Sequence, residues 1–255
     1  INNFNWKSKK WLNSKGIENY FEGLFKNVNY EAKNTTEYKN DKNNSELHTA
    51  LGYFAKFPLY KENFTDRIFH SLTPRFLLRY APGHMRNTEN GNRLSYSNLF
   101  NLNKVNEPDI VESGLSSSIG FEYKKNILND QNQLGDEVFS LSAGQVISDK
   151  ENMDIPSNTS LDQKFSDIVG EATYKISDTV NLNYNFSIDQ SYKNFNYNEV
   201  GTDLIFDKAK FNLSYLQEKE HIGEQEFVQK GLDLKLNNFT ELSFNTKRNL
   251  LTNSA

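Results

Sequence analysis

The sequence has no cysteine and only four histidines among its 255 residues. The missing cysteine excludes disulfides, thiolate catalysis and cysteine-ligated metals within this chain, but it leaves the cellular compartment open. The four histidines are His48, His70, His84 and His221. They show no metal-ligand spacing, and loop or surface imidazoles are the simpler interpretation. We therefore expect no metal and no cofactor.

Long apolar runs and catalytic motifs are missing as well. No window approaches the roughly 18 apolar residues of a membrane helix, but a membrane barrel needs only every second residue to be apolar. A near-balanced formal net charge of −4 disfavours nucleic acid as a partner. The run from Gly114 to Ser118 is no nucleophile elbow, because its fifth residue is Ser and it leads into a predicted strand. We expect no enzymatic activity.

The sequence is rich in aromatic residues that alternate with polar ones. It has 19 Phe and 13 Tyr, although its hydrophobic share is 36% and its mean hydropathy is −0.75. The clearest example places Val180, Leu182, Tyr184, Phe186 and Ile188 between Asn181, Asn183, Asn185, Ser187 and Asp189. Because side chains alternate between the faces of a strand, this run predicts one apolar and one polar face.

The same period of two recurs along the chain. It is found at 51–59, 76–80, 119–123, 211–215, 232–236 and 242–244, and weakly around Leu24, Leu94, Phe139 and Ile168. We expect about a dozen strands, many near the ~9 to 11 residues of a membrane-crossing strand, and no helix.

The predicted connections resemble the short turns and long loops at opposite ends of outer-membrane barrels. Short turns are expected at 13–16, 177–178 and 237–238, and long polar insertions at 33–46, 83–92, 126–136 and 217–226. The segment 149–164 is long where a short turn is expected, so a strand is miscounted or hidden there.

A soluble sandwich and a membrane barrel both show this alternation. Aromatic residues near strand ends, such as Phe57, Tyr80, Tyr123 and Tyr215, favour the barrel, because they match interfacial girdles. We predict an all-β, antiparallel transmembrane β-barrel, present in part, as a single domain over residues 1–255. The chain starts at Ile1 without a leader, and we interpret it as a piece of a longer protein.

Arg75 and Arg79 share the face of a predicted strand opposite Phe76, Leu78 and Tyr80. They would therefore project into the lumen or lie near a rim. In either place they could meet anionic lipid headgroups, which is a hypothesis about these two side chains.

A series of motifs in fixed order resembles the LptD family of lipopolysaccharide-assembly proteins, most clearly over residues 70–200. The segments are LTPRFLLRYAP at 72–82, MRN at 85–87, NLF at 98–100, ESG at 112–114, GFEY at 120–123, FSDIVG at 165–170 and YNFSID at 184–189. The motif positions are Pro74, Arg75, Arg79, Tyr80, Pro82, Arg86, Asn87, Gly114, Gly120, Ser166, Asp167, Gly170 and Asp189.

The resemblance implies an internal portion of a large outer-membrane barrel that releases lipopolysaccharide into the outer leaflet of a Gram-negative cell. It also implies as partners outer-membrane lipid, the plug lipoprotein LptE and a periplasmic transport bridge. Asn181, Asn183, Asn185 and Asp189 would then face the lumen. Val180, Leu182, Tyr184, Phe186 and Ile188 would face lipid.

Two other interpretations remain open. One is a generic outer-membrane porin or channel, which the full-length gene would separate from the assembly protein. The other is a soluble glycan-binding β-sandwich, which would not partition into detergent or show heat-modifiable gel mobility.

Overall fold

The computed structural model describes residues 1–33, 43–88, 91–219 and 223–252. His221 and parts of the insertions predicted at 33–46, 83–92 and 217–226 lie outside the described residues. Among the described residues, no helix has the length and apolar character needed to cross a membrane.

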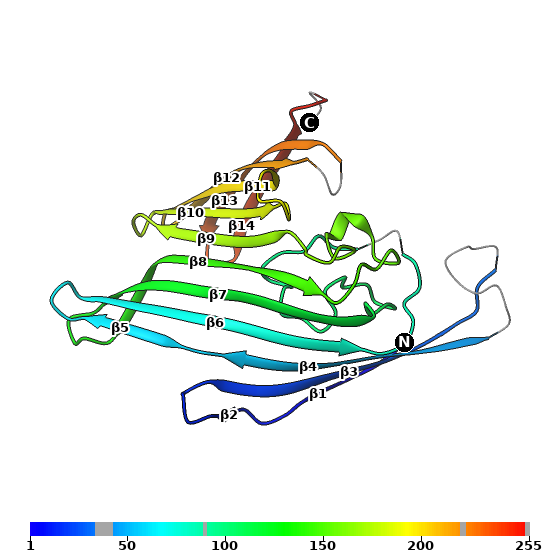
Figure 1. The fold of residues 1–255 in the computed structure, drawn as a ribbon. Coiled ribbons are helices and arrows are strands. Elements are labelled where there is room, and N and C mark those ends of the chain that lie inside the picture. The colour runs from blue at the N-terminus through cyan, green and yellow to red at the C-terminus, as the bar shows by residue number, and fades with distance from the viewer. Residues whose placement is uncertain (34–42, 89–90, 220–222, 253–255) are drawn as a thin grey trace. The chain divides into compact units, whose positions relative to one another are not determined.

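The described chain is built from β-strands and a single 3-10 turn, η1 (Ser157–Thr159) (Figure 1). The strands are β1 (Asn2–Lys7), β2 (Trp11–Leu12), β3 (Glu18–Tyr30), β4 (Asn44–Lys56), β5 (Leu59–Asn63), β6 (Ile68–Ala81), β7 (Gly114–Leu128), β8 (Leu134–Ser148), β9 (Ile168–Lys175), β10 (Val180–Ile188), β11 (Phe195–Ile205), β12 (Ala209–Glu218), β13 (Gln225–Asn237) and β14 (Thr240–Asn249).

The strands pair in chain order, as in an antiparallel meander. The order is β1-β3-β4-β6-β7-β8-β9-β10-β11-β12-β13-β14, with β2 also on β3 and β5 also on β6. The predicted all-β antiparallel class is confirmed, and so are the strands expected at 76–80, 119–123, 211–215, 232–236 and 242–244.

The chain divides into two units, and we describe each by itself. Unit 1 comprises Ile1–Pro58, Thr73–Phe121 and Gly144–Ile168, and unit 2 comprises Leu59–Leu72, Glu122–Ala143 and Val169–Ala255. Strands β6, β7 and β8 contribute residues to both, and so does β9 through its first residue, Ile168. The single domain over 1–255 stays a prediction.

The connection between β7 and β8 corrects one predicted loop. It covers only 129–133, so the long insertion expected at 126–136 is wrong. The Asn129 side chain closes the turn, because its Oδ1 accepts the backbone N–H groups of Gln131 and Gln133, each at 2.9 Å. Short and long connections alternate in an outer-membrane barrel. Because the connection between β7 and β8 is short, the next one, 149–167, is expected to be long, as it is. It adds only an isolated bridge between Ile147 and Phe165, so no strand is hidden there.

Two other predicted strands also differ. The run at 51–59 is interrupted after Lys56, because Pro58 has no N–H to donate to a ladder, and β5 begins at Leu59. Leu94 lies in no strand. It belongs to the connection 82–113, where its side chain is 1% exposed.

The core of unit 1 lies beneath its two long connections, 82–113 and 149–167. Backbone contacts join them: Thr88 N–H donates to Asp154 O and Leu94 N–H to Thr159 O, each at 3.3 Å. Their apolar side chains are buried with those of β3, β4, β6 and β8; the core includes Val28, Phe54, Leu77, Leu99, Val105 and Val146. The two connections therefore form much of the buried interior of this unit, and Met85 and Thr88 of the insertion predicted at 83–92 are buried with them.

Candidate functional site: a two-faced wall and a covered ion cluster

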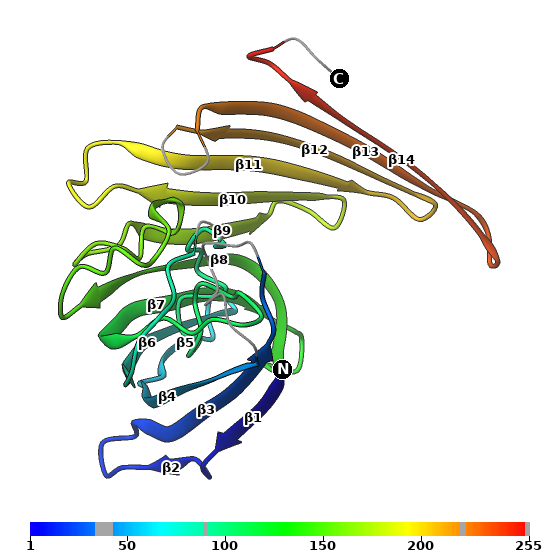
Figure 2. The same cartoon turned by 90° about the vertical axis from the view of Figure 1, so that its right-hand side faces the viewer.

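Strands β10 to β14 of unit 2 lie side by side (Figure 2) and keep polar and apolar side chains on separate faces. In the paired strands, Asn183 is aligned with Gly201, Ser214, Gln229 and Lys247, so these five positions lie on one face. On the opposite face, the row Val180, Leu204, Phe211, Leu232 and Phe244 is apolar in all five strands, whereas the next row, Leu182, Thr202, Leu213, Lys230 and Thr246, mixes apolar and polar residues. Along the Val180 row, the alternation predicted for one strand thus extends across five.

The polar face holds a groove of about 510 Å³. Its lining includes Asn183, Asn185, Glu199, Gly201, Asp203, Asn212, Ser214, Gln229 and Asn245. The Glu199 carboxylate accepts hydrogen bonds from Asn185 Nδ2 at 3.2 Å and from the Tyr197 hydroxyl at 2.7 Å. Asn181, Asn183 and Asn185, the residues predicted to face the lumen, therefore lie on one surface rich in amides and acceptors.

The apolar face leaves large side chains exposed. Leu213 is 47% and Phe244 59% exposed, and Leu182, Val200, Phe211 and Leu242 are also exposed. Val180, Tyr184, Phe186 and Ile188 are half-buried on the same face. A soluble sandwich would bury such a face against a second sheet, so its exposure favours a lipid environment.

Gly170, a motif residue on β9, lies beneath the aromatic stripe of β10. A Cβ atom at this position would collide with the Phe186 ring and lie 2.7 Å from Ser142 O. The Phe186 ring also stacks on Tyr184, with centroids 5.5 Å apart. Glycine is therefore required at 170 to accommodate the Phe186 ring.

Asp189 lies outside the strand face on which it was expected. Strand β10 ends at Ile188, and the Asp189 carboxylate accepts hydrogen bonds from the Ser191 hydroxyl, Lys193 N–H and Asn194 Nδ2. Desolvation acts to raise the pKa of Asp189, but these hydrogen bonds prevail and lower it. The residue organises the turn 189–194.

In unit 1, Arg75 and Arg79 lie on the face of β6 that the connection 82–113 covers. Arg79 is 1% exposed; its Nε donates to Leu102 O at 2.6 Å, and its guanidinium also donates to Glu112 O. The Arg75 guanidinium lies 4.2 Å from the centre of the Phe100 ring. Arg79 is therefore buried under the connection and not open at a lumen or a rim, where it was expected; the contact of these arginines with lipid headgroups stays a prediction. Tyr80, on the opposite face, is 53% exposed.

Glu112 and Lys104 complete a buried ion cluster with Arg79. Glu112 Oε1 lies 3.7 Å from both Arg79 Nε and Lys104 Nζ. The same carboxylate accepts the backbone N–H of Lys104 at 2.9 and 3.0 Å and that of Val105 at 3.4 Å. Burial lowers the pKa of Lys104 to about 8, against the opposing attraction of Glu112. The cluster anchors the connection to β6.

Two leucines of the same connection fit above strand glycines. Leu102 Cδ2 would lie 2.5 Å from a Cβ atom at Gly52 on β4. Leu99 would contact a Cβ atom at Gly144 on β8, which would also lie 2.5 Å from Ile119 O and 2.9 Å from Gly120 Cα. The glycines, including the motif residue Gly120, thus bring strands and connection into close contact.

Arg86, Ser166 and Asp167 are further motif residues of unit 1, and they form contacts near the ends of its strands. Arg86 Nε donates to Glu46 Oε2, and its guanidinium bonds to Asp109 Oδ2, each at 2.8 Å. Ser166 Oγ accepts Val146 N–H at 2.9 Å and donates to Asp167 O at 2.8 Å. Both Ser166 and Asp167 are buried.

The other motif residues of unit 1 act through their backbone or are exposed. Pro74 O accepts Phe57 N–H at 3.0 Å. Gly114 begins β7 with a φ of +108°, in the region that favours glycine. Pro82 and Asn87 are exposed.

Sequence reasoning named Glu112 only as part of a motif and did not single out Lys104. The sequence does contain a signal for the burial of Glu112. This residue directly follows the apolar pair Ile110 and Val111, and such a pair is unusual in a solvated loop.

Two of the histidines have protein partners. His48 is buried, with Nε2 3.5 Å from Glu46 Oε2, and His70 Nδ1 lies 2.8 Å from the Tyr123 hydroxyl oxygen. Within the described part of the chain, no three acidic or histidine side chains converge as metal ligands do.

Comparison with protein families matched residues 21–248 to the model of LptD, LPS transport system D. Comparison with curated proteins gave no match. Among solved structures, two mutants of the Rh. blastica porin are similar, each with 10% identity. The first alignment covers 92% of this chain and 95% of that chain with a TM-score of 0.32, and the second covers 91% and 94% with a TM-score of 0.33.

Proposed function

The chain belongs to the LptD family, LPS transport system D, and from this premise we propose that its β10–β14 wall borders the path along which lipopolysaccharide moves through the outer membrane. Lipopolysaccharide transport is the function of the family. The polar face, with Asn181, Asn183 and Asn185, would face the path. The apolar face, with Val180, Leu182, Tyr184, Phe186 and Ile188, would face membrane lipid.

The observation that carries this proposal is the separation of the two faces over five adjacent strands, which is complete in the Val180 row. A groove rich in Asn, Gln and Ser offers many hydrogen-bond partners to sugar hydroxyls. An exposed face of Leu, Phe and Val has no comparable use in water. A wall between a hydrated lumen and lipid requires both.

We further propose the outer membrane of a Gram-negative cell as the location, with transport and no covalent chemistry as the activity. The LptE plug and the periplasmic bridge are proposed partners on the strength of family membership alone. A plug would meet the polar faces, since a membrane barrel turns its polar face to the lumen.

Site-specific photocrosslinking in living cells tests the assignment of faces. We would place p-benzoylphenylalanine at Asn183 and, as the matched control, at the adjacent Leu182, and detect lipopolysaccharide adducts by immunoblot. Adducts at Asn183 should depend on newly made lipopolysaccharide, because they would come from molecules in transit. They should disappear within minutes when synthesis is blocked.

Adducts at Leu182 would come from resident membrane lipid and should persist through the same block. The proposal fails if Asn183 gives no adduct while synthesis continues, or if both positions respond alike to the block.

A further inference from the structure

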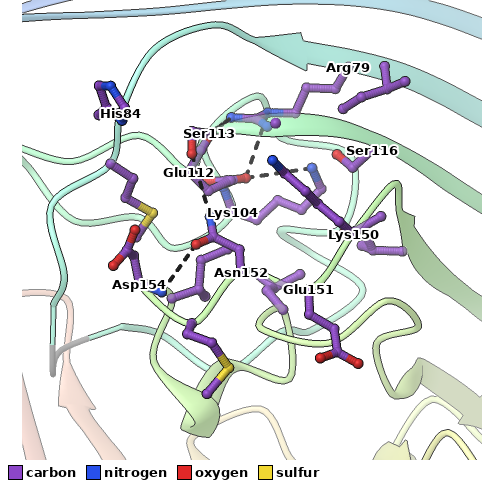
Figure 3. A pocket seen from close by; sticks show the side chains of 18 of the residues that line it. Arg79, His84, Lys104, Glu112, Ser113, Ser116, Lys150, Glu151, Asn152 and Asp154 are labelled. Carbon is purple, nitrogen blue, oxygen red and sulfur yellow. Dashed lines mark hydrogen bonds and ion pairs between the residues drawn. The ribbon is translucent and has the colours of Figure 1, made fainter.

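A cavity of about 350 Å³ adjoins the buried ion cluster of unit 1 (Figure 3). Arg79 of β6 and Ser116 of β7 form part of its wall, together with Lys104 and Glu112 of the connection 82–113. Lys150, Asn152 and other residues of the connection 149–167 complete it. Three separate stretches of chain thus bring charged groups to one partly open cavity, at which Lys150 is exposed.

The buried groups next to this cavity are unbalanced in charge. Arg79 and Lys104 have side chains 1% exposed, and only one carboxylate, that of Glu112, lies within ion-pair distance of both. Glu112 also accepts the backbone N–H groups of Lys104 and Val105, so its acceptor capacity is largely used. An uncompensated buried charge is costly, and the lowered pKa of Lys104 agrees with a missing negative charge.

Lys150 adds a third cation from the opposite side. Figure 3 shows its side chain directed into the cavity, toward Lys104 and Glu112, while the Glu151 carboxylate points away from them. Asp154 lies at a different part of the cavity wall in the same view. Around Glu112 the cations therefore outnumber the carboxylates.

We propose that this cavity is an oxyanion site that binds a phosphate group between Lys104, Lys150 and Arg79. Lysine ammonium groups and arginine guanidinium groups are the side chains that bind phosphate in proteins. Ser113, Ser116 and Asn152 provide hydroxyl and amide donors on the same wall. The phosphate group can belong to free phosphate or to a lipid headgroup, since the recognised chemistry is the same.

Binding of two probes to the purified, detergent-solubilised protein tests this site. The probes are inorganic phosphate and dioctanoyl phosphatidate, and the readout is isothermal titration calorimetry, with sodium chloride at equal ionic strength as the blank. We expect saturable binding of at least one probe. Lys150→Met should weaken it at least tenfold, because the substitution removes a cation that the ion cluster does not need for folding.

Lys164→Met is the matched control, because Lys164 is an exposed lysine of the same connection that does not line the cavity. It should leave the affinity unchanged. Binding of phosphate alone would identify a free-anion site, and binding of phosphatidate would extend it to headgroups. No saturable binding of either probe, or equal losses for Lys150→Met and Lys164→Met, would overturn the proposal. The crosslinking at Asn183 does not report on this cavity, so either proposal can fail alone.

Discussion

At the scale of single residues, side-chain size decides where strands and connections can meet. Gly52 and Gly144 carry no side chain at the points where Leu102 and Leu99 descend onto β4 and β8. Apolar side chains that fit into such recesses gain dispersion contacts on all sides, and a single added methyl group removes that fit. Glycine at these points therefore serves packing of the connection.

Gly144→Ala should destabilise the folded protein by about 1 to 3 kcal/mol, the usual range for overpacking. Its Cβ would contact Leu99 and lie 2.5 Å from Ile119 O, a backbone atom that cannot move aside cheaply. Gly201→Ala is the control, because its nearest neighbour, Ser214 Cβ, would be 3.6 Å away. Thermal unfolding followed by circular dichroism in detergent should separate the two; equal midpoints would refute the packing role.

At the scale of elements, an ion cluster fastens the connection 82–113 to β6. Arg79 bonds two carbonyls of the connection, those of Leu102 and Glu112, and Glu112 in turn holds the backbone at Lys104. Because these groups are buried, removing one partner leaves the other charged and unpaired in a low-dielectric environment.

Arg79→Met should therefore cost about 3 to 5 kcal/mol and raise hydrogen exchange in residues 99–112. Arg79→Met combined with Glu112→Gln should cost less than the sum of the single changes, with a coupling of about 1 to 3 kcal/mol. The exposed pair Lys7 and Glu22, 2.5 Å apart, is the matched control and should couple by less than about 1 kcal/mol. Strict additivity at Arg79 and Glu112 would contradict the role of the cluster.

The strands and the short turns expected at 13–16, 177–178 and 237–238 were largely predictable from the sequence, but the packing of the long connections was not. Val180 to Ile188 alternate strictly, and a local period of two is enough to assign both strand and faces. Leu94 shows why the rest failed: its weak alternation suggested a strand, but its burial depends on Thr159 and other residues far along the chain. Arg79 likewise contacts Leu102 and Glu112, which lie 23 and 33 residues further along the chain, and no local pattern encodes such contacts.

At the scale of the whole molecule, a low mean hydropathy results from averaging two opposite surfaces. Amide and charged side chains on one face offset Phe, Leu and Val on the other, so the mean hydropathy of −0.75 describes neither. The free energy of unfolding of the whole protein also depends on its few buried charges. Lys104 is the clearest, because its pKa is lowered to about 8.

Stability should consequently rise with pH between about 8 and 10.5. In that window the unfolded chain, with a lysine of ordinary pKa, binds more protons than the folded one, so raising the pH favours folding. A shift of this size corresponds to about 3 kcal/mol when fully developed. Urea unfolding at pH 7.5 and 10, in buffer free of phosphate, should show most of this increment in the native sequence and lose it in Lys104→Met, which keeps every other titrating group. If both proteins gain equally as the pH rises, Lys104 is not the residue whose charge is costly in the folded state.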